Sequence, residues 1–124
     1  MPLVDLIDET FIRAPPSALT AAVHDREFWS KLWPGLRLRI DQDRAGKGIR
    51  WLCDGQLAGS AEVWLEPYAS GVIVHCYLRV DPTSVWSPRR LRRESRQRQL
   101  QVKRVMFALK DRLEVGLGPT SAVK

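Results

Sequence analysis

The sequence is poor in the residue types that hold metals or form disulfide frameworks. Among its 124 residues there are two cysteines, Cys53 and Cys76, and two histidines, His24 and His75. These four residues form neither a CxxC pair nor a Cys/His cluster with the spacing of a zinc site. We therefore expect no metal and no cofactor, and we expect two free, buried thiols in a cytoplasmic protein.

Long apolar runs are also missing. None approaches the roughly 18 residues of a membrane-spanning helix, so no transmembrane segment is expected. The N-terminal stretch MPLVDLIDET is already acidic at Asp5, which does not fit a signal peptide. With 44% hydrophobic and 27% charged residues, the chain has the composition and the length of one globular domain over residues 1–124.

The sequence has no evident catalytic constellation. It places no serine or cysteine nucleophile beside either histidine. Asp8 and Glu9 are neighbours on an expected strand and therefore point to opposite faces, which excludes a facing carboxylate pair. The GKG at 46–48 lacks the pattern of a phosphate-binding loop. Catalytic residues therefore stay unassigned.

Period-two alternation is the clearest pattern that the chain does have. Residues 3–13 favour a strand, which the Ala-Pro-Pro at 14–16 ends. Two short helices are expected next, at 17–24 and at 26–33, the second capped by Asp25. Four alternating segments follow between residues 36 and 80, with short loops between them. They predict an antiparallel meander with one apolar face.

A single long helix is expected over residues 88–115, capped by Ser87 and ended by Gly116 and the Gly118-Pro119 pair. It would be about 42 Å long at 1.5 Å per residue. One apolar face runs along it, formed by Val102, Val105, Met106, Leu109 and Leu113. Because nothing else can cover the sheet, the helix should lie across the apolar face. The sheet residues expected beneath it are Val63, Leu65, Val74, Cys76 and Leu78.

The positive charge of the chain is concentrated in that helix. Half of the 20 basic residues lie between Arg89 and Arg112, a segment that contains only the acids Glu94 and Asp111. The segment carries a net charge of +8 and the rest of the chain −2. Most charge runs of this kind are solvated, so we predict that RRLRRESRQR at 89–98 reads no nucleic-acid sequence. Non-specific contact with nucleic acid or another acidic partner stays an alternative.

Four sequence segments resemble those of the START-like superfamily, which includes polyketide cyclases/dehydrases, lipid-transfer domains and proteins of the birch-pollen allergen type. The segments are FIRAPPSAL, AAVHDREFWSKLWPGL, GSAEVWLEPYASGVIVHCYLRVD and VKRVMFALKDRLEVGL. The resemblance implies an α+β helix-grip fold, in which a curved antiparallel sheet wraps a long C-terminal helix around an apolar cavity. We count about five strands, where the common form has seven.

Five residues are candidates for a ligand-binding pocket. Trp29, Trp33 and Trp51 should face the interior from the second short helix and the sheet, where aromatic side chains either line a pocket or fill the core. Arg98 lies about 80° from Met106 on the helical wheel, near Val102 on the apolar face. An arginine facing inward there can bind an acidic head group, although it can also reach water beyond the sheet.

These patterns favour binding of a small apolar or amphipathic ligand, such as a lipid or a polyketide-like molecule, between the sheet and the C-terminal helix. The resemblance raises a polyketide cyclase/dehydrase-type enzyme as the alternative. A third hypothesis is an electrostatic binding module that uses the basic helix 88–112.

Trp64 lies between Glu62 and Glu66 on the expected outer face of the sheet, where it could mark a homodimer contact.

Overall fold

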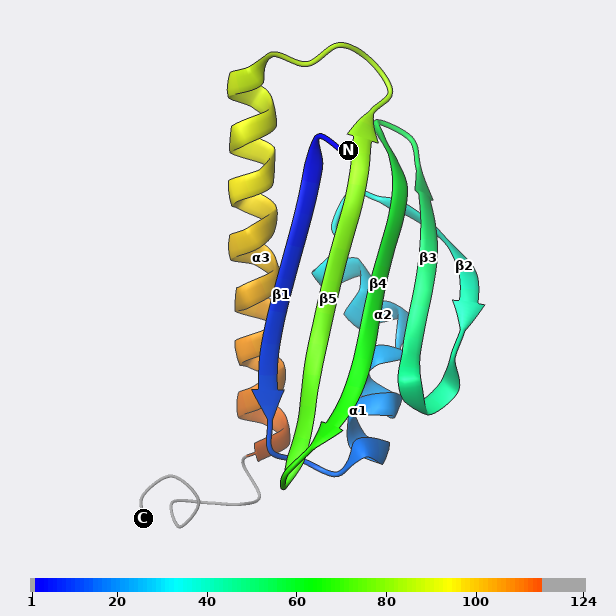
Figure 1. Ribbon diagram of the computed structural model, residues 1–124, viewed down its shortest axis with the longest axis vertical. Helices are drawn as coiled ribbons and strands as arrows, with labels where there is room; N and C mark the ends of the chain where they lie inside the picture. The colour runs from blue at the N-terminus through cyan, green and yellow to red at the C-terminus, as the bar shows by residue number, and fades with distance from the viewer. Residues whose placement is uncertain (1, 115–124) are drawn as a thin grey trace.

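The computed structural model describes residues 2–114 of the chain. One open sheet runs through it, with the strands in the order β1-β5-β4-β3-β2 and every neighbouring pair antiparallel. The three α-helices lie on one side of this sheet (Figure 1). In chain order the elements are β1 (Val4–Ile12), α1 (Pro16–Val23), α2 (Arg26–Leu32), β2 (Arg37–Asp43), the 3-10 turn η1 (Ala45–Lys47), β3 (Gly48–Asp54), β4 (Leu57–Tyr68), β5 (Gly71–Pro82) and α3 (Pro88–Glu114).

The predicted α+β helix-grip architecture is confirmed, including its five strands, two short helices and long C-terminal helix. Alternate residues of the strands are buried under the helices, because successive side chains of a strand point to opposite faces. The five sheet residues expected under the helix are all at most 3% exposed. On α3, Val102, Met106 and Leu109 are buried with them, whereas Val105 is only partly buried.

The expected helix caps are largely confirmed. The side chain of Asp25 accepts a hydrogen bond from the backbone N–H of Glu27 at 3.0 Å, and Ser87 Oγ accepts one from Arg90 at 3.1 Å. The first short helix begins at Pro16 rather than at Ser17, because a proline fits the first turn of a helix, where its missing N–H is not needed. The glycines expected to end α3 lie outside the described residues.

Both edges of the sheet are protected against pairing with another strand. On β1, side chains of α3 bind free backbone carbonyls: Gln99 Nε2 donates to Ile7 at 3.2 Å and Lys110 Nζ donates to Phe11 at 2.8 Å. The other edge, β2, is almost entirely exposed, carries charged side chains and is interrupted by a bulge at Asp41. Charges and bulges are common means of blocking edge-to-edge association.

An ionic contact beneath α3 fixes this helix to β1. Lys103 Nζ lies 2.8 Å from Asp8 Oδ1 and donates to Thr10 Oγ1 at 3.1 Å, while Thr10 Oγ1 donates to Asp8 Oδ2 at 3.0 Å. The Asp8 side chain is 3% exposed, so these two partners replace the water contacts that its carboxylate loses on burial. Among the described residues, no helix is long and apolar enough to cross a membrane.

Candidate ligand-binding site

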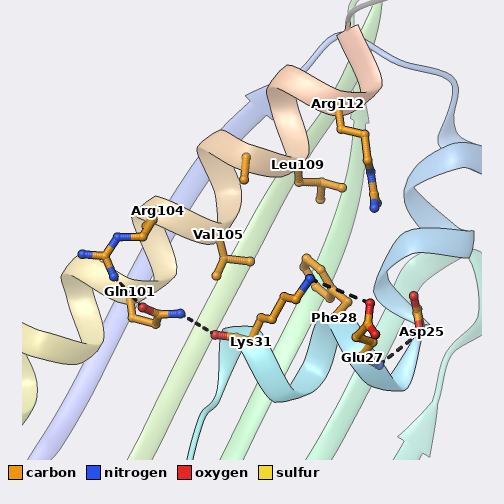
Figure 2. A pocket seen from close by; sticks show the side chains of 10 residues that line it. Asp25, Glu27, Phe28, Lys31, Gln101, Arg104, Val105, Leu109 and Arg112 are labelled. Carbon is orange, nitrogen blue, oxygen red and sulfur yellow. Dashed lines mark hydrogen bonds and ion pairs between the residues drawn. The ribbon is translucent and has the colours of Figure 1, made fainter.

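An open groove separates α2 from α3 on the helical side of the molecule (Figure 2). Its volume is about 420 Å³, which is within the usual range of small-molecule sites. Phe28 of α2 and Val105 and Leu109 of α3 form its apolar floor. The residues that line it are Asp25, Glu27, Phe28, Lys31, Gln101, Arg104, Val105, Ala108, Leu109 and Arg112. The partial exposure of Val105 follows from its position in this groove.

The rim of the groove is charged and carries more cations than anions. Lys31, Arg104 and Arg112 bring positive charge, whereas Asp25 and Glu27 lie together at the start of α2. The Asp25 carboxylate is already used as a helix cap. Lys31 Nζ is 3.8 Å from Glu27 Oε1, and both side chains are mostly exposed, so this ion pair is weak. An apolar floor with a cationic rim suits an amphipathic molecule with an acidic group.

A hydrogen-bonded bridge divides this groove from a second one. Gln101 Nε2 donates to the Lys31 carbonyl at 2.8 Å, and Arg104 Nη1 donates to Gln101 Oε1 at 2.7 Å (Figure 2). Both residues line both grooves. The second groove has a volume of about 370 Å³ and is more polar, with Pro34, Glu94, Gln97, Arg98 and Leu100 as its other lining residues.

Arg98 faces inward, one of the two directions that the sequence left open, and Glu94 pairs with its charge. Its side chain is 11% exposed, Nε donates to Glu94 Oε2 at 2.7 Å, and Nη1 donates to the Pro34 carbonyl at 2.9 Å. The guanidinium thereby ties α3 to the loop that follows α2. The sequence argument missed Glu94 as its partner, although the spacing of four residues on one helix is a recognised signal for such a pair.

The three predicted tryptophans are buried behind the grooves. Trp29 is 8% exposed, and its indole N–H donates to the Val23 carbonyl at 2.6 Å. Its ring meets Trp51 edge to face at a centroid distance of 5.3 Å. Trp33 and Trp51 are at most 1% exposed, and their indole nitrogens have no hydrogen-bond partner among the described residues. Such unpaired donors are rare in protein interiors.

The predicted pocket residues thus surround the grooves without all lining them. Of the five, Arg98 lines the second groove, while Val102 and the three tryptophans lie in the core beside it. The grooves depend instead on Phe28, Gln101 and Val105, none of which the sequence argument selected as a site residue. These three residues line a groove because of the way α2 packs beside α3, and no local sequence pattern predicts that packing.

The two cysteines are poor nucleophiles in this fold. Burial raises the pKa of the Cys53 thiol to about 11, and the nearby charge of Arg98 opposes this only in part. Burial also raises the pKa of Cys76, whose Sγ lies 3.9 Å from Met106 Sδ. Both thiols are therefore protonated at neutral pH. Within residues 2–114, no group of three or more His, Cys, Asp or Glu side chains could hold a metal ion.

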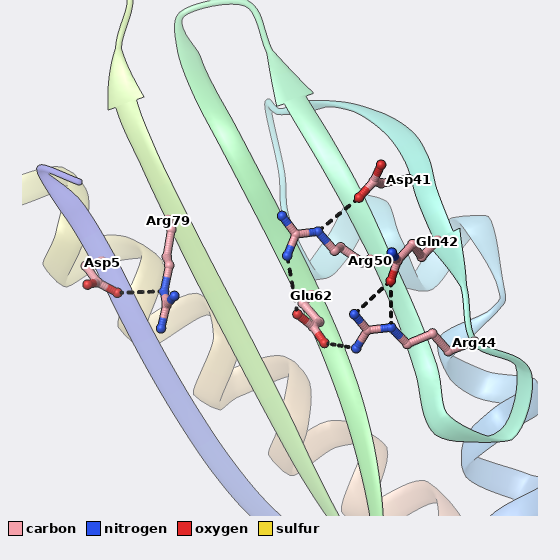
Figure 3. Close-up of polar contacts among 7 residues, drawn as sticks. All are labelled: Asp5, Asp41, Gln42, Arg44, Arg50, Glu62 and Arg79. Carbon is pink, nitrogen blue, oxygen red and sulfur yellow. Dashed lines mark hydrogen bonds and ion pairs between the residues drawn. The ribbon is translucent and has the colours of Figure 1, made fainter. Parts of the chain in front are cut away.

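The outer face of the sheet carries paired charges and a buried histidine. The ring nitrogens of His75 lie 3.0 Å from Glu9 Oε2 and 2.8 Å from Glu66 Oε1, and Trp64 stacks on the ring at 4.2 Å. Trp64 is therefore partly covered within the chain, and the homodimer stays a prediction. Farther along this face, the ion pairs of Figure 3 join Arg50 to Asp41, Arg44 to Glu62 and Arg79 to Asp5.

The sequence matches no family model and no curated protein. Solved structures do match. The protein DR_A0006 from Deinococcus radiodurans is 19% identical, with a TM-score of 0.67 over 90% of this chain and 98% of that one. The Aha1 dimer from Colwellia psychrerythraea is 14% identical, with a TM-score of 0.62 over 93% of this chain and 99% of that one.

A third match is the di-domain ARO/CYC StfQ from the steffimycin biosynthetic pathway. It is 12% identical, with a TM-score of 0.56 over 88% of this chain and 51% of that one. At such identities the likeness concerns the fold. The chain shares its α+β fold with these structures, and the helix-grip architecture is the one that its sequence predicted.

Proposed function

We propose that the protein binds a small apolar or amphipathic molecule between the sheet, α2 and α3. The observation that carries this proposal is the groove with its floor of Phe28, Val105 and Leu109. Apolar clefts with a few polar groups at the margin are the usual form of small-molecule sites. In this proposal the apolar part of the ligand lies on the floor, and its polar end faces Lys31 and Arg104.

The interior behind the grooves supports the same function. Within residues 2–114, the buried indole N–H groups of Trp33 and Trp51 have no acceptor, and an unpaired buried donor costs about 1–3 kcal/mol. A ligand that carries oxygen atoms and reaches past α2 could accept these hydrogen bonds. We therefore propose that the predicted set Trp29, Trp33, Trp51, Arg98 and Val102 forms the inner end of the site. Cyclase or dehydrase activity has no comparable side-chain observation in its favour.

The test uses the amphipathic fluorescent dye anilinonaphthalene sulfonate, whose aromatic rings suit the floor and whose sulfonate suits the rim. It should bind with a dissociation constant of about 1 μM, or about −8 kcal/mol. Val105→Trp fills the groove from a partly buried position, and Val102→Phe fills the interior. Val85→Trp is the matched control, because Val85 is 99% exposed and lies in the loop before α3. The control should bind the dye like the unchanged protein.

Each variant has a distinct meaning. Loss of dye binding in Val105→Trp places the ligand in the groove, and loss in Val102→Phe places it in the interior. Because Val102 is fully buried, its variant is first checked for a folded circular dichroism spectrum and a cooperative melt. The proposal fails if the unchanged protein binds no dye, or if binding survives both substitutions.

A further inference from the structure

The face of α3 that points away from the sheet carries a regularly spaced row of arginines and large apolar residues. Six residues follow one another at intervals of three or four and lie within about 80° on the helical wheel, roughly opposite the buried Val102, Met106 and Leu109. We call this set the basic stripe, and it consists of Arg89, Arg93, Arg96, Leu100, Arg104 and Phe107. It extends over about 27 Å of helix. Figure 1 shows α3 along one side of the molecule, and all six residues of the stripe are exposed.

The arginines of the stripe make no ion pair with any residue from 2 to 114. This distinguishes them from Arg98, which Glu94 neutralises, and from the arginines of the outer sheet face, which pair with carboxylates. The four stripe arginines are all exposed. The molecule therefore presents a line of uncompensated positive charge on one helix.

Two large apolar side chains interrupt this line of charge. Leu100 is 57% exposed and Phe107 is 52% exposed, two helical turns apart on the same face. Because they lie beside the arginines, this face of α3 is both cationic and partly apolar. A nucleic-acid duplex offers phosphates but little apolar surface for Leu100. The interface of an anionic bilayer offers phosphate or carboxylate groups together with acyl chains.

We propose that the basic stripe docks the protein on an anionic phospholipid surface. A straight stripe on one helix matches a flat partner, because all six side chains can reach one plane without a complementary shape. The arginines bind the head groups, and Leu100 and Phe107 enter the interface between them. The stripe and the groove meet at Arg104, so a molecule leaving the lipid surface would be released beside the proposed site.

The experiment is cosedimentation with large vesicles of phosphatidylcholine, with and without about one third phosphatidylserine, at about 0.15 M salt. The unchanged protein should bind the anionic vesicles and not the neutral ones. The double variant Arg93→Gln/Arg96→Gln should bind about 25-fold more weakly, at about fivefold for each lost charge. Arg93→Lys/Arg96→Lys should keep most of the binding, because it keeps the charge.

The matched control is Arg37→Gln/Arg39→Gln, which removes the same charge from exposed positions of β2. It should change vesicle binding by no more than about twofold, whereas Leu100→Ala/Phe107→Ala should weaken it at constant charge. The proposal is overturned if the unchanged protein does not bind anionic vesicles, or if the control loses as much vesicle binding as Arg93→Gln/Arg96→Gln. It is also overturned if the protein binds a DNA duplex at the same salt concentration more tightly than it binds the vesicles. Dye binding without vesicles should be unaffected in Arg93→Gln/Arg96→Gln, because neither arginine lines a groove, so the two proposals can fail separately.

Discussion

At the scale of single residues, the tryptophans differ in how their indole nitrogens are used. Trp29 and Trp33 are one turn apart at the end of α2, and both are buried. Only Trp29 has an acceptor among the described residues, the Val23 carbonyl at the end of α1. Trp29 therefore joins the two short helices by a hydrogen bond, whereas Trp33 contributes packing alone.

Replacement of each tryptophan by phenylalanine should separate these contributions. Both variants lose ring area, but Trp29→Phe also leaves the Val23 carbonyl without its partner. The free energy of unfolding should fall by about 1 kcal/mol more for Trp29→Phe than for Trp33→Phe. Urea denaturation of the two variants measures the difference. Equal losses would mean that the Trp29 hydrogen bond contributes nothing net.

The sequence predicted the burial of these tryptophans, because burial follows from position on an element, and it left open whether Arg98 faces inward or reaches water. It did not predict which indole N–H groups are paired, since the acceptors come from other segments. The groove escaped prediction for the same reason. Gln101 owes its role to the Lys31 carbonyl, which is distant in the chain.

At the scale of elements, α3 is attached to β1 through polar contacts as well as through its apolar face. Lys103 is central, because it meets a carboxylate that is almost fully buried. Asp8 lies on the inner face of β1 with Leu6 and Thr10, where an unpaired charge would be costly. The alternation of β1 would predict an apolar residue there, so the Asp8–Lys103 pair departs from the pattern of the sheet.

Lys103→Met should lower the free energy of unfolding by about 2–3 kcal/mol, because it leaves the Asp8 carboxylate buried without a counterion. Combination with Asp8→Val should recover most of the loss, since it removes the charge that was left unpaired. The control Lys31→Met breaks an exposed pair and should cost less than about 1 kcal/mol. Chemical denaturation of the four proteins tests this, and a double variant as unstable as Lys103→Met would contradict it.

At the scale of the whole molecule, several weak acids are held in their protonated forms by the fold. Burial raises the pKa of Cys53 to about 11 from an ordinary value of 9.0, and it raises the pKa of Cys76 and of Tyr77 as well. All three lie on β3 and β5 of the same sheet. Their combined effect is a coupling between pH and stability on the alkaline side.

Stability should therefore decline as pH rises above about 9. Below that pH the thiols are protonated in both the folded and the unfolded state and contribute no pH dependence. Between about 9 and 11 the unfolded chain releases the Cys53 proton while the folded chain keeps it, which favours unfolding by up to about 1.4 kcal/mol per pH unit. Cys53→Ala should flatten the dependence of the free energy of unfolding on pH. Parallel curves for the variant and the unchanged protein would refute this.

The position of β1 in the sheet has a consequence for the order in which the chain assembles. Neighbouring strands from β2 to β5 follow one another along the chain and pair as hairpins, whereas β1 pairs only with β5, with Val4 opposite Val80. Side chains of α3 also bind its free backbone carbonyls. Local pairings form faster than distant ones, so the meander should assemble first. On the ribosome, β1 would be made before the rest of the sheet and would wait unpaired until both β5 and α3 have emerged. During that interval the apolar side chains of β1 have no partner strand or helix to cover them. Chaperone binding to β1, or incorrect pairing of β1 with another strand, would occur at that stage.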